Sequence, residues 1–267
     1  MRNIKLTLSY DGTDFNGWQT QPGYRTVQET LENAIAQLTG EERIRVNASG
    51  RTDAGVHAVG QVVNFYSNTE HSPEVLVRAI NAHLPDDVVI RDAADVPQSF
   101  DANRDAKCKL YRYIIHDGDV PDPFLRRFAF HCRHKLDVSK MCAAAKALEG
   151  RHDFHSFETD WPNRMSSVRT ITHLAIQRVS SHFLPIEVGP ASRAGPESAG
   201  DFIWIEVEAD GFLYNMVRAI AGTLINVGRG YWPVEQVSAI LQAEDRAQAG
   251  PTAPAHGLFL MRVRYER

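Results

Sequence analysis

The chain is poor in cysteine: Cys108, Cys132 and Cys142 are its only three among 267 residues. The count is odd and no CxxC pair occurs, which argues against a disulfide framework and favours a reducing compartment. No run reaches the roughly 18 apolar residues that a membrane helix needs. The first residues alternate like a strand and lack the apolar core of a signal peptide. We therefore expect a cytoplasmic protein with no membrane segment.

Motifs for nucleotide cofactors and for metals are also missing. No GxGxxG or GxxxxGK[ST] segment occurs, which disfavours nucleotide cofactors. A metal-dependent hydrolase is one alternative, but the segment HDFH does not match the HExxH spacing of a zinc helix, and no cysteine pair supports it. Its candidate ligands would be His131, His134, His152, Asp153 and His155. We expect neither a metal nor a cofactor.

The chain has no net positive charge; its formal net charge is -4. A polyanionic partner would have to be held by local charge, and residues 101–135 hold eight Lys and Arg against five Asp. This segment is the candidate RNA-facing stretch, and a solvated surface is the alternative. Besides Arg104, its basic residues are Lys107, Lys109, Arg112, Arg126, Arg127, Arg133 and Lys135, and its histidines are His116, His131 and His134.

Apolar periodicity predicts an α+β fold in the first half of the chain. Thr26 opens a helix that ends before Gly40, with Glu29 completing a capping box. A second helix starts at Ser72–Pro73 and continues through Leu84. Alternating segments predict strands at residues 4–10, 43–49, 59–66 and 87–92. The order is β-α-β-β-α-β, which favours an antiparallel sheet with two helices on one face.

The second half repeats this order. Strands are predicted at residues 110–116, 168–179, 202–209 and 258–265, and helices at 137–148, 212–227 and 233–242. We therefore predict two tandem ferredoxin-like (RRM-like) halves, residues 1–100 and 101–267, which share a central antiparallel sheet and leave a cleft between them. Residues 184–200 are rich in Gly, Pro, Ala and Ser and are interpreted as a mobile loop.

The most unusual segment is GRTDAGVH, residues 50–57, which joins two predicted strands. Glycines at both ends allow a sharp bend and a close approach to a ligand. Arg51, Asp53 and His57 are crowded into this bend. One interpretation is a hairpin whose Asp53 caps its own turn; the other is a site of chemistry.

Two further residues favour a site. The helix predicted over 212–227 is apolar almost all round, so it should be buried, yet Arg218 lies in its middle. A buried guanidinium requires a partner, and Asp53 is the best candidate carboxylate; alternatively Arg218 reaches the surface or binds carbonyl groups. Tyr111 lies on the predicted strand LYRYIIH, where an aromatic ring either packs in the core or stacks on an unpaired base.

These segments resemble the tRNA pseudouridine synthase A family, which is similar to eukaryotic Pus1-type enzymes. The segment GRTDAGVHA resembles the family's signature, and the resemblance covers nearly the whole chain. The other matching segments are LSYDGTDFNGWQTQP, VQETLENAI, FDAN, KLYRYII, LEGRHDFHSF, FLYNMVRAIAGTL and APAHGLFL. The segment ETDWPNRMSS and a long loop at 184–200 depart from the family pattern.

The resemblance implies the pseudouridine synthase fold, usually as a homodimer. It also implies isomerisation of uridines 38, 39 and 40 in the tRNA anticodon stem-loop, without cofactor or metal. It maps the catalytic aspartate onto Asp53 and its arginine partner onto Arg218. It maps the base-stacking tyrosine onto Tyr111 and an apolar contact to the base onto Leu258, while Arg51 would contact RNA or support the loop. The main rival is a non-catalytic RNA-binding module, which would not need Asp53.

Overall fold

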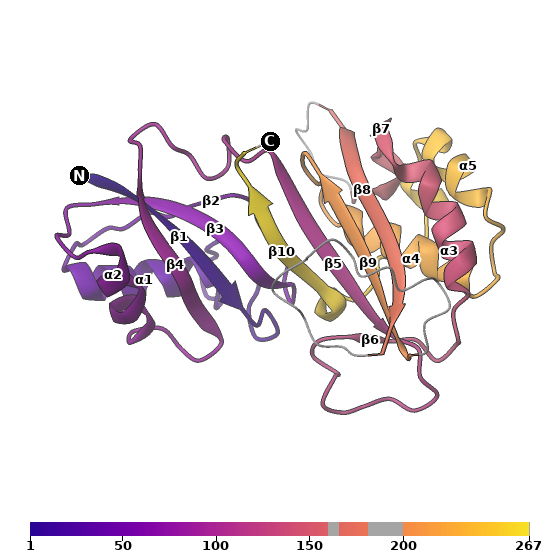
Figure 1. Cartoon of the computed structure of the whole chain (residues 1–267), viewed down its shortest axis with the longest axis horizontal. Helices are drawn as coiled ribbons and strands as arrows, with labels where there is room; N and C mark the ends of the chain where they lie inside the picture. Colours follow the sequence, from indigo (N-terminus) through magenta and orange to yellow (C-terminus); the bar gives the residue numbers. More distant parts are fainter. Residues whose placement is uncertain (160–165, 181–199, 267) are drawn as a thin grey trace. The chain divides into compact units, whose positions relative to one another are not determined.

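The computed structural model describes residues 1–159, 166–180 and 200–266. They form two compact units, Met1–Lys107 with Phe259–Arg267, and Cys108–Leu258 (Figure 1). The boundary predicted from the sequence lies at residue 100, and the prediction placed the C-terminal residues in the second half. The segment interpreted as a mobile loop, 184–200, lies outside the described residues except for its last residue, as does most of ETDWPNRMSS.

The first unit is a sheet with two helices. Its strand order is β4-β1-β3-β10; β1 is antiparallel to β3 and β4, whereas β10 is parallel to β3, and the short β2 pairs with β3. The elements are β1 (Arg2–Tyr10), α1 (Val27–Thr39), β2 (Asn47–Ala48), β3 (His57–Ser67), α2 (Pro73–Asn81), β4 (Val88–Val96) and β10 (Leu258–Arg264). The predicted order β-α-β-β-α-β is therefore confirmed here.

The core of this unit follows from its two periodicities. Leu6 and Leu8 lie two residues apart on β1, so they face the same side of the sheet, and both are fully buried. Leu31 and Ile35 are four residues apart on α1, and Ile80 lies on the buried side of α2. The two helices lie side by side (Figure 1), and this core fixes the ends of β2 and β3, between which residues 50–56 lie.

The second unit is an antiparallel sheet with the order β5-β9-β8-β7, and β6 adds a short parallel pairing to β5. Helix α3 packs against α4 and β8, and α4 packs against β5 (Figure 1). The elements are β5 (Cys108–His116), β6 (Phe130–His131), α3 (Val138–Ala145), β7 (Gly150–Asp153), β8 (Val168–Val179), β9 (Phe202–Ala209), α4 (Met216–Gly228) and α5 (Gln236–Ala243). Short 3-10 helices occupy Lys146–Leu148, His155–Phe157, Arg246–Gln248 and Ala255–Gly257.

The α+β prediction is confirmed, while the sharing of one sheet by two tandem halves stays a prediction. The strands predicted at 168–179 and 202–209 have the predicted bounds. The last predicted strand, now β10, pairs with β3 of the first unit. Strands β6 and β7 were not predicted; each has four residues or fewer, too short for a clear alternation.

Three local predictions were wrong. The strand expected at 43–49 is reduced to β2, because the Val46 N–H donates to the Glu32 carboxylate in place of a neighbouring strand. The capping box is absent: Thr26 is the N-cap residue of α1, but its side chain makes no capping hydrogen bond. The helix expected from residue 212 starts only at Met216, because Asn215 has a left-handed backbone (φ 62°).

Candidate functional site

Asp53 lies in the connection between β2 and β3, on a tight turn. The Val56 N–H donates to the Asp53 carbonyl over 3.1 Å, and Gly55 has a φ of +76°, which suits glycine. Asp53 is half-buried and Thr52 is buried, whereas Arg51 is exposed. The turn therefore leaves Asp53 partly accessible to solvent, between the buried Thr52 and the exposed Ala54.

The segment after β1, residues 11–18, packs against this turn. Trp18 N donates to the Thr52 carbonyl over 3.0 Å, and Gly55 N donates to the Phe15 carbonyl over 3.3 Å. A Cβ atom added to Gly17 would lie 2.8 Å from the Thr52 carbonyl oxygen, and one added to Gly12 would lie 2.0 Å from that of Val56. The two backbones approach so closely that only glycine fits at both positions.

Replacing Gly17 by alanine is expected to disturb the Asp53 turn directly. Gly17 has a φ of +84° and meets the Thr52 carbonyl, whereas Gly23 has a φ of +80° and nothing within 4 Å of an added Cβ. Each change costs about 1 kcal/mol of unfolding free energy for the left-handed backbone. Only Gly17→Ala should add about 1–3 kcal/mol for the clash. Urea unfolding of both variants measures the difference; equal losses would contradict the close contact.

His57 begins β3 and anchors the far end of the turn. Its Nδ1 atom lies 3.0 Å from Gly12 N and 3.1 Å from the Asp11 carboxylate, and its ring stacks on Phe259 at 4.6 Å. Nδ1 accepts from Gly12 N–H when it carries no proton and donates to Asp11 when it does. Burial tends to raise the pKa of Asp11, but hydrogen bonds from His57 and Thr13 outweigh it and hold that pKa well below its ordinary value. Asp11 is therefore ionised at neutral pH.

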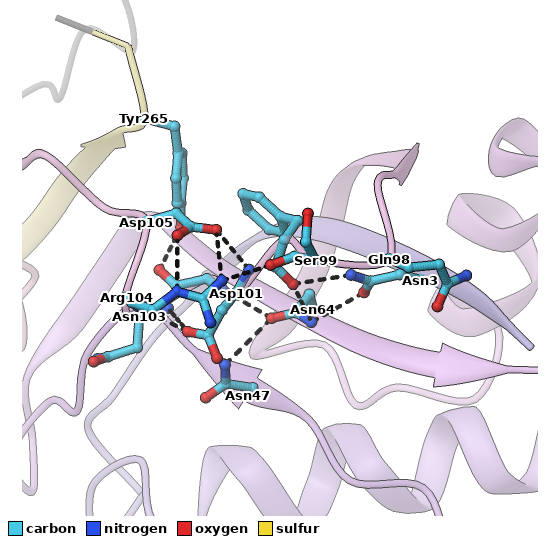
Figure 2. A network of polar contacts seen from close by, with 12 residues as sticks. Asn3, Asn47, Asn64, Gln98, Ser99, Asp101, Asn103, Arg104, Asp105 and Tyr265 are labelled. Atoms are coloured by element: carbon cyan, nitrogen blue, oxygen red, sulfur yellow. Dashed lines mark hydrogen bonds and ion pairs between the residues drawn. The ribbon is translucent and has the colours of Figure 1, made fainter.

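Segment 97–105, which contains the motif FDAN, is held to the first unit's sheet by a network of polar contacts (Figure 2). Asn3 on β1 donates to the Pro97 and Phe100 carbonyls, and Asn64 on β3 accepts from Ala102 N. The Asn103 amide then donates to the Ser49 carbonyl over 2.8 Å, next to the first residue of the GRTDAGVH motif. This link from FDAN to the Asp53 turn could not be read from the sequence.

Tyr111 lies on β5 in the second unit. Its ring is buried, with 7% of the residue exposed, and meets the edge of the Phe212 ring with centroids 5.0 Å apart. The neighbouring Arg112 does not face solvent, because it bonds to the Glu206 carboxylate at 2.6 and 3.0 Å and lies 3.8 Å over the Trp204 ring. Its assignment to an RNA-facing stretch was therefore wrong.

His116 is buried as well, so it is the second residue of the stretch that was wrongly placed on the surface. Its pKa is lowered by burial and by the neighbouring His131. Other members of the stretch are exposed and stay candidates for RNA contact; they are Lys107, Arg126, Arg133, His134 and Lys135.

Arg218 lies on α4, a helix that is buried almost all round, as predicted. The residue itself is half-buried, and it donates to the Ala253 carbonyl at 2.7 Å and to the Asn215 side chain at 2.8 Å. The carbonyl contact is the alternative that the sequence analysis left open. Asn215, whose left-handed backbone delays the start of the helix, is thus a partner of Arg218 that was not predicted from the sequence.

The segment after Ala253 brings Leu258 to the strand of Tyr111. The Tyr113 hydroxyl donates to the Pro254 carbonyl over 2.9 Å, and a Cβ atom on Gly257 would lie 2.8 Å from the Tyr113 ring. Burial raises the pKa of Tyr113, against the opposing charge of Arg218. Leu258 follows this contact and is buried.

The structure therefore places the predicted residues in two groups. Arg51 and Asp53 lie in the first unit, while Tyr111, Arg218 and Leu258 lie in the second. The pairing of Asp53 with Arg218 stays a prediction. Within the described residues, no group of three or more His, Cys, Asp or Glu side chains could hold a metal ion. Across the same part of the chain, no helix is long and apolar enough to cross a membrane.

Comparison with known proteins gives the following similarities. A family model described as tRNA pseudouridine synthase matches residues 7–103 and 144–266. A protein of Acetivibrio thermocellus named tRNA pseudouridine synthase A is 42% identical over 265 residues, covering 99% of this chain and 100% of the relative. A protein of the same name from Chloroflexus aurantiacus is 44% identical over 272 residues, covering 99% of this chain and 89% of the relative.

Similarity to solved structures is much weaker. A chain from the crystal structure of a Cbf5-Nop10-Gar1 complex is 11% identical and aligns with a TM-score of 0.35. The alignment covers 96% of this chain and 57% of that chain. A similarity at this level carries no argument about the site.

Proposed function

We propose, since the chain belongs to the tRNA pseudouridine synthase family, that it isomerises uridine to pseudouridine at positions 38, 39 and 40 of the tRNA anticodon stem-loop. The supporting observation in the structure is the half-buried Asp53, held on a turn whose backbone is braced by a second loop. A carboxylate in such a place keeps a fixed direction, as attack on one bond of one nucleotide requires.

The reaction exchanges one glycosidic bond for another. The N1–C1′ bond of uridine breaks, the detached uracil turns, and a C5–C1′ bond forms. The C5 proton is then lost and N1 gains a proton, so atoms and electrons balance without an oxidant or a group donor. The protein has to supply access to the base, an ionised group beside the sugar, and exclusion of water.

Asp53 is the group that acts on the sugar. Two routes are open to it: the carboxylate attacks C1′, or it removes the proton at C2′ to give a glycal. Both routes require the ionised form. Arg218 is the proposed counter-charge that keeps the carboxylate ionised in a site of low dielectric, and Ala253 and Asn215 fix the direction of its guanidinium.

The remaining residues hold the nucleotide. The uridine leaves the helical stack at a cost of a few kcal/mol, and stacking on an aromatic ring compensates for part of that cost. Tyr111 is the proposed stacking residue and Leu258 the apolar contact to the base. Arg51, which is exposed two residues before Asp53, is the proposed contact to the RNA backbone. We also infer that the protein acts as a cytoplasmic homodimer, as the family resemblance implies.

Release of tritium from C5 tests the function. The purified protein is incubated with tRNA that carries tritium at uridine C5, and the released tritium is counted, because only formation of the C5–C1′ bond displaces that hydrogen. We expect release from a tRNA with uridine at 38, 39 or 40. A matched tRNA with cytidine at all three positions should release none. Release from the second tRNA would contradict the position, and release from neither would contradict the activity.

A further inference from the structure

Three polar side chains are buried beneath the turn that carries Asp53. Tyr10 comes from the end of β1, and His57 and Gln61 come from β3. Their exposed fractions are 4%, 1% and 0%. Burying a hydroxyl, an imidazole or an amide costs free energy unless each makes hydrogen bonds, and apolar side chains would form the same strands without that cost. The hydrogen bonds of Tyr10, His57 and Gln61 therefore indicate the role of these buried side chains.

Gln61 holds the start of the turn. Its side-chain oxygen accepts from the Ser49 hydroxyl over 2.6 Å, and its amide nitrogen donates to the Gly50 carbonyl over 2.8 Å. The Asn103 amide donates to the Ser49 carbonyl from the other side. The chain entering the GRTDAGVH motif is thus fixed at two successive residues, directly before exposed Arg51.

Tyr10 holds the residue that precedes Asp53. Its hydroxyl lies 2.8 Å from the Thr52 hydroxyl, in a contact where either group can donate, and both residues are buried. The Thr52 carbonyl also accepts from Trp18 N. Thr52 is therefore held by its side chain and its backbone, so the direction in which the next residue projects is set by the end of β1.

His57 is the first residue after the turn, and it is held by the hydrogen bond from Gly12 N and by stacking on the Phe259 ring. Gly55 N is held by the Phe15 carbonyl. Each stretch of backbone beside Asp53 is thus bonded to a fixed part of the same unit. The bonds come from two strands, β1 and β3, and from segment 11–18.

Resting on the proposed function, we infer that Tyr10, Gln61 and His57 are positioning residues for the reaction: they set the direction of the Asp53 carboxylate through Thr52, Gly50 and Gly12. They touch the loop backbone and its neighbours. Displacement of a reacting group by about 1 Å can cost on the order of 100-fold in rate. Loss of one such bond should therefore slow the chemical step by about 10- to 100-fold and leave tRNA affinity within about twofold of native.

Tyr10→Phe is the sharpest test, because it removes one hydroxyl and keeps the buried ring. The rate of tritium release is measured with enzyme in excess over tRNA, so that it reports the chemical step, and tRNA affinity and thermal stability are measured beside it. Tyr66→Phe is the control for removing a tyrosine hydroxyl elsewhere on the sheet: Tyr66 lies on β3, and its hydroxyl donates to the Gln98 carbonyl over the same 2.8 Å, away from the Asp53 turn. Because Tyr66 is 41% exposed and Tyr10 only 4%, this variant should lose less stability than Tyr10→Phe and keep the native rate.

Thr52→Val removes the other half of the same bond, and it serves where Tyr10→Phe does not fold. If the bond acts as inferred, Thr52→Val should slow the chemical step by itself and should add no further loss of rate to Tyr10→Phe, since the bond can be lost only once. Additive losses of rate in the double variant would overturn the inference. A native rate in Tyr10→Phe would also overturn it, as would a loss of rate in Tyr66→Phe equal to that in Tyr10→Phe. Failure of the native chain to release tritium would instead contradict the proposed function itself.

Discussion

Asp53→Ala is expected to abolish tritium release while tRNA affinity stays close to that of the native chain. The side chain is half-buried on a turn held by its neighbours, so its removal leaves the fold in place and takes away the only group proposed to act on the sugar. The loss in rate should be on the order of 10⁴-fold or more, as for other enzymes that lose their main reacting group.

Asp53→Asn is the control that separates charge from shape. It keeps the volume of the side chain and removes the ionised oxygen, and both routes open to Asp53 need that ion. It should therefore be as inactive as Asp53→Ala. The non-catalytic RNA-binding module makes the opposite prediction, because its function would survive both changes. Release at the native rate by either variant would remove Asp53 from the mechanism.

Asp117→Ala is expected to have the largest effect on stability. Asp117 directly follows β5, its side chain is fully buried, and it makes two hydrogen bonds of 2.7 and 2.8 Å to Arg178 on β8. It also accepts from Leu136 N over 3.0 Å. Removing the carboxylate leaves the Arg178 guanidinium enclosed without its counter-charge, which costs about 3–5 kcal/mol. Urea unfolding at neutral pH measures the loss.

Asp201→Ala is the matched control, because Asp201 bonds to Lys135 on the surface, with both side chains more than half exposed. It should cost less than about 1 kcal/mol. Equal losses in the two variants would contradict the importance of the buried pair.

The pH dependence gives this pair a second signature. Burial tends to raise the pKa of Asp117, but hydrogen bonds from Arg178 and Leu136 and the charges of Arg178 and Lys135 outweigh it, so the folded-state pKa lies below the ordinary value. A carboxyl group with a depressed pKa stabilises the fold above its unfolded-state pKa, and this contribution is lost as the pH falls through its folded-state pKa. The difference in the free energy of unfolding between the native chain and Asp117→Ala should therefore become smaller at acid pH.

The sequence predicted elements where burial and strand pairing coincide. On 168–179 the buried residues Leu174, Ile176 and Arg178 alternate with more exposed ones, whereas every residue of 202–209 is buried. The two strands pair from Ile171 to Val179, so the predicted bounds were confirmed. In 43–49 the same alternation reflects burial alone: Ile44 and Val46 are buried, but the backbone finds a side-chain partner instead of a strand. Periodicity reports which side chains face inward and does not show which group pairs with the backbone.

The position of the charged residue Arg112 was wrongly predicted for a related reason. Arg112 was counted with a basic surface stretch, although it alternates with apolar residues on its strand. Its partner Glu206 lies 94 residues further along the chain, directly across the sheet on β9. Similarly, Tyr10 and Thr52 are far apart in sequence and meet only because β1 and β3 pair. The sequence could single out the turn around Asp53, but only the folded strands show what holds it.

The parallel pairing of β10 with β3 has a consequence for how the protein forms in the cell. During synthesis the ribosome releases the chain from its N-terminal end, so β3 emerges long before Phe259 exists. Until all of residues 108–258 have been translated, β3 cannot pair with β10, and His57 lacks the Phe259 ring on which it stacks. The unit that carries Asp53 is therefore complete only after the other unit has been synthesised. A nascent chain that stalls before Phe259 lacks both β10 and the ring on which His57 stacks.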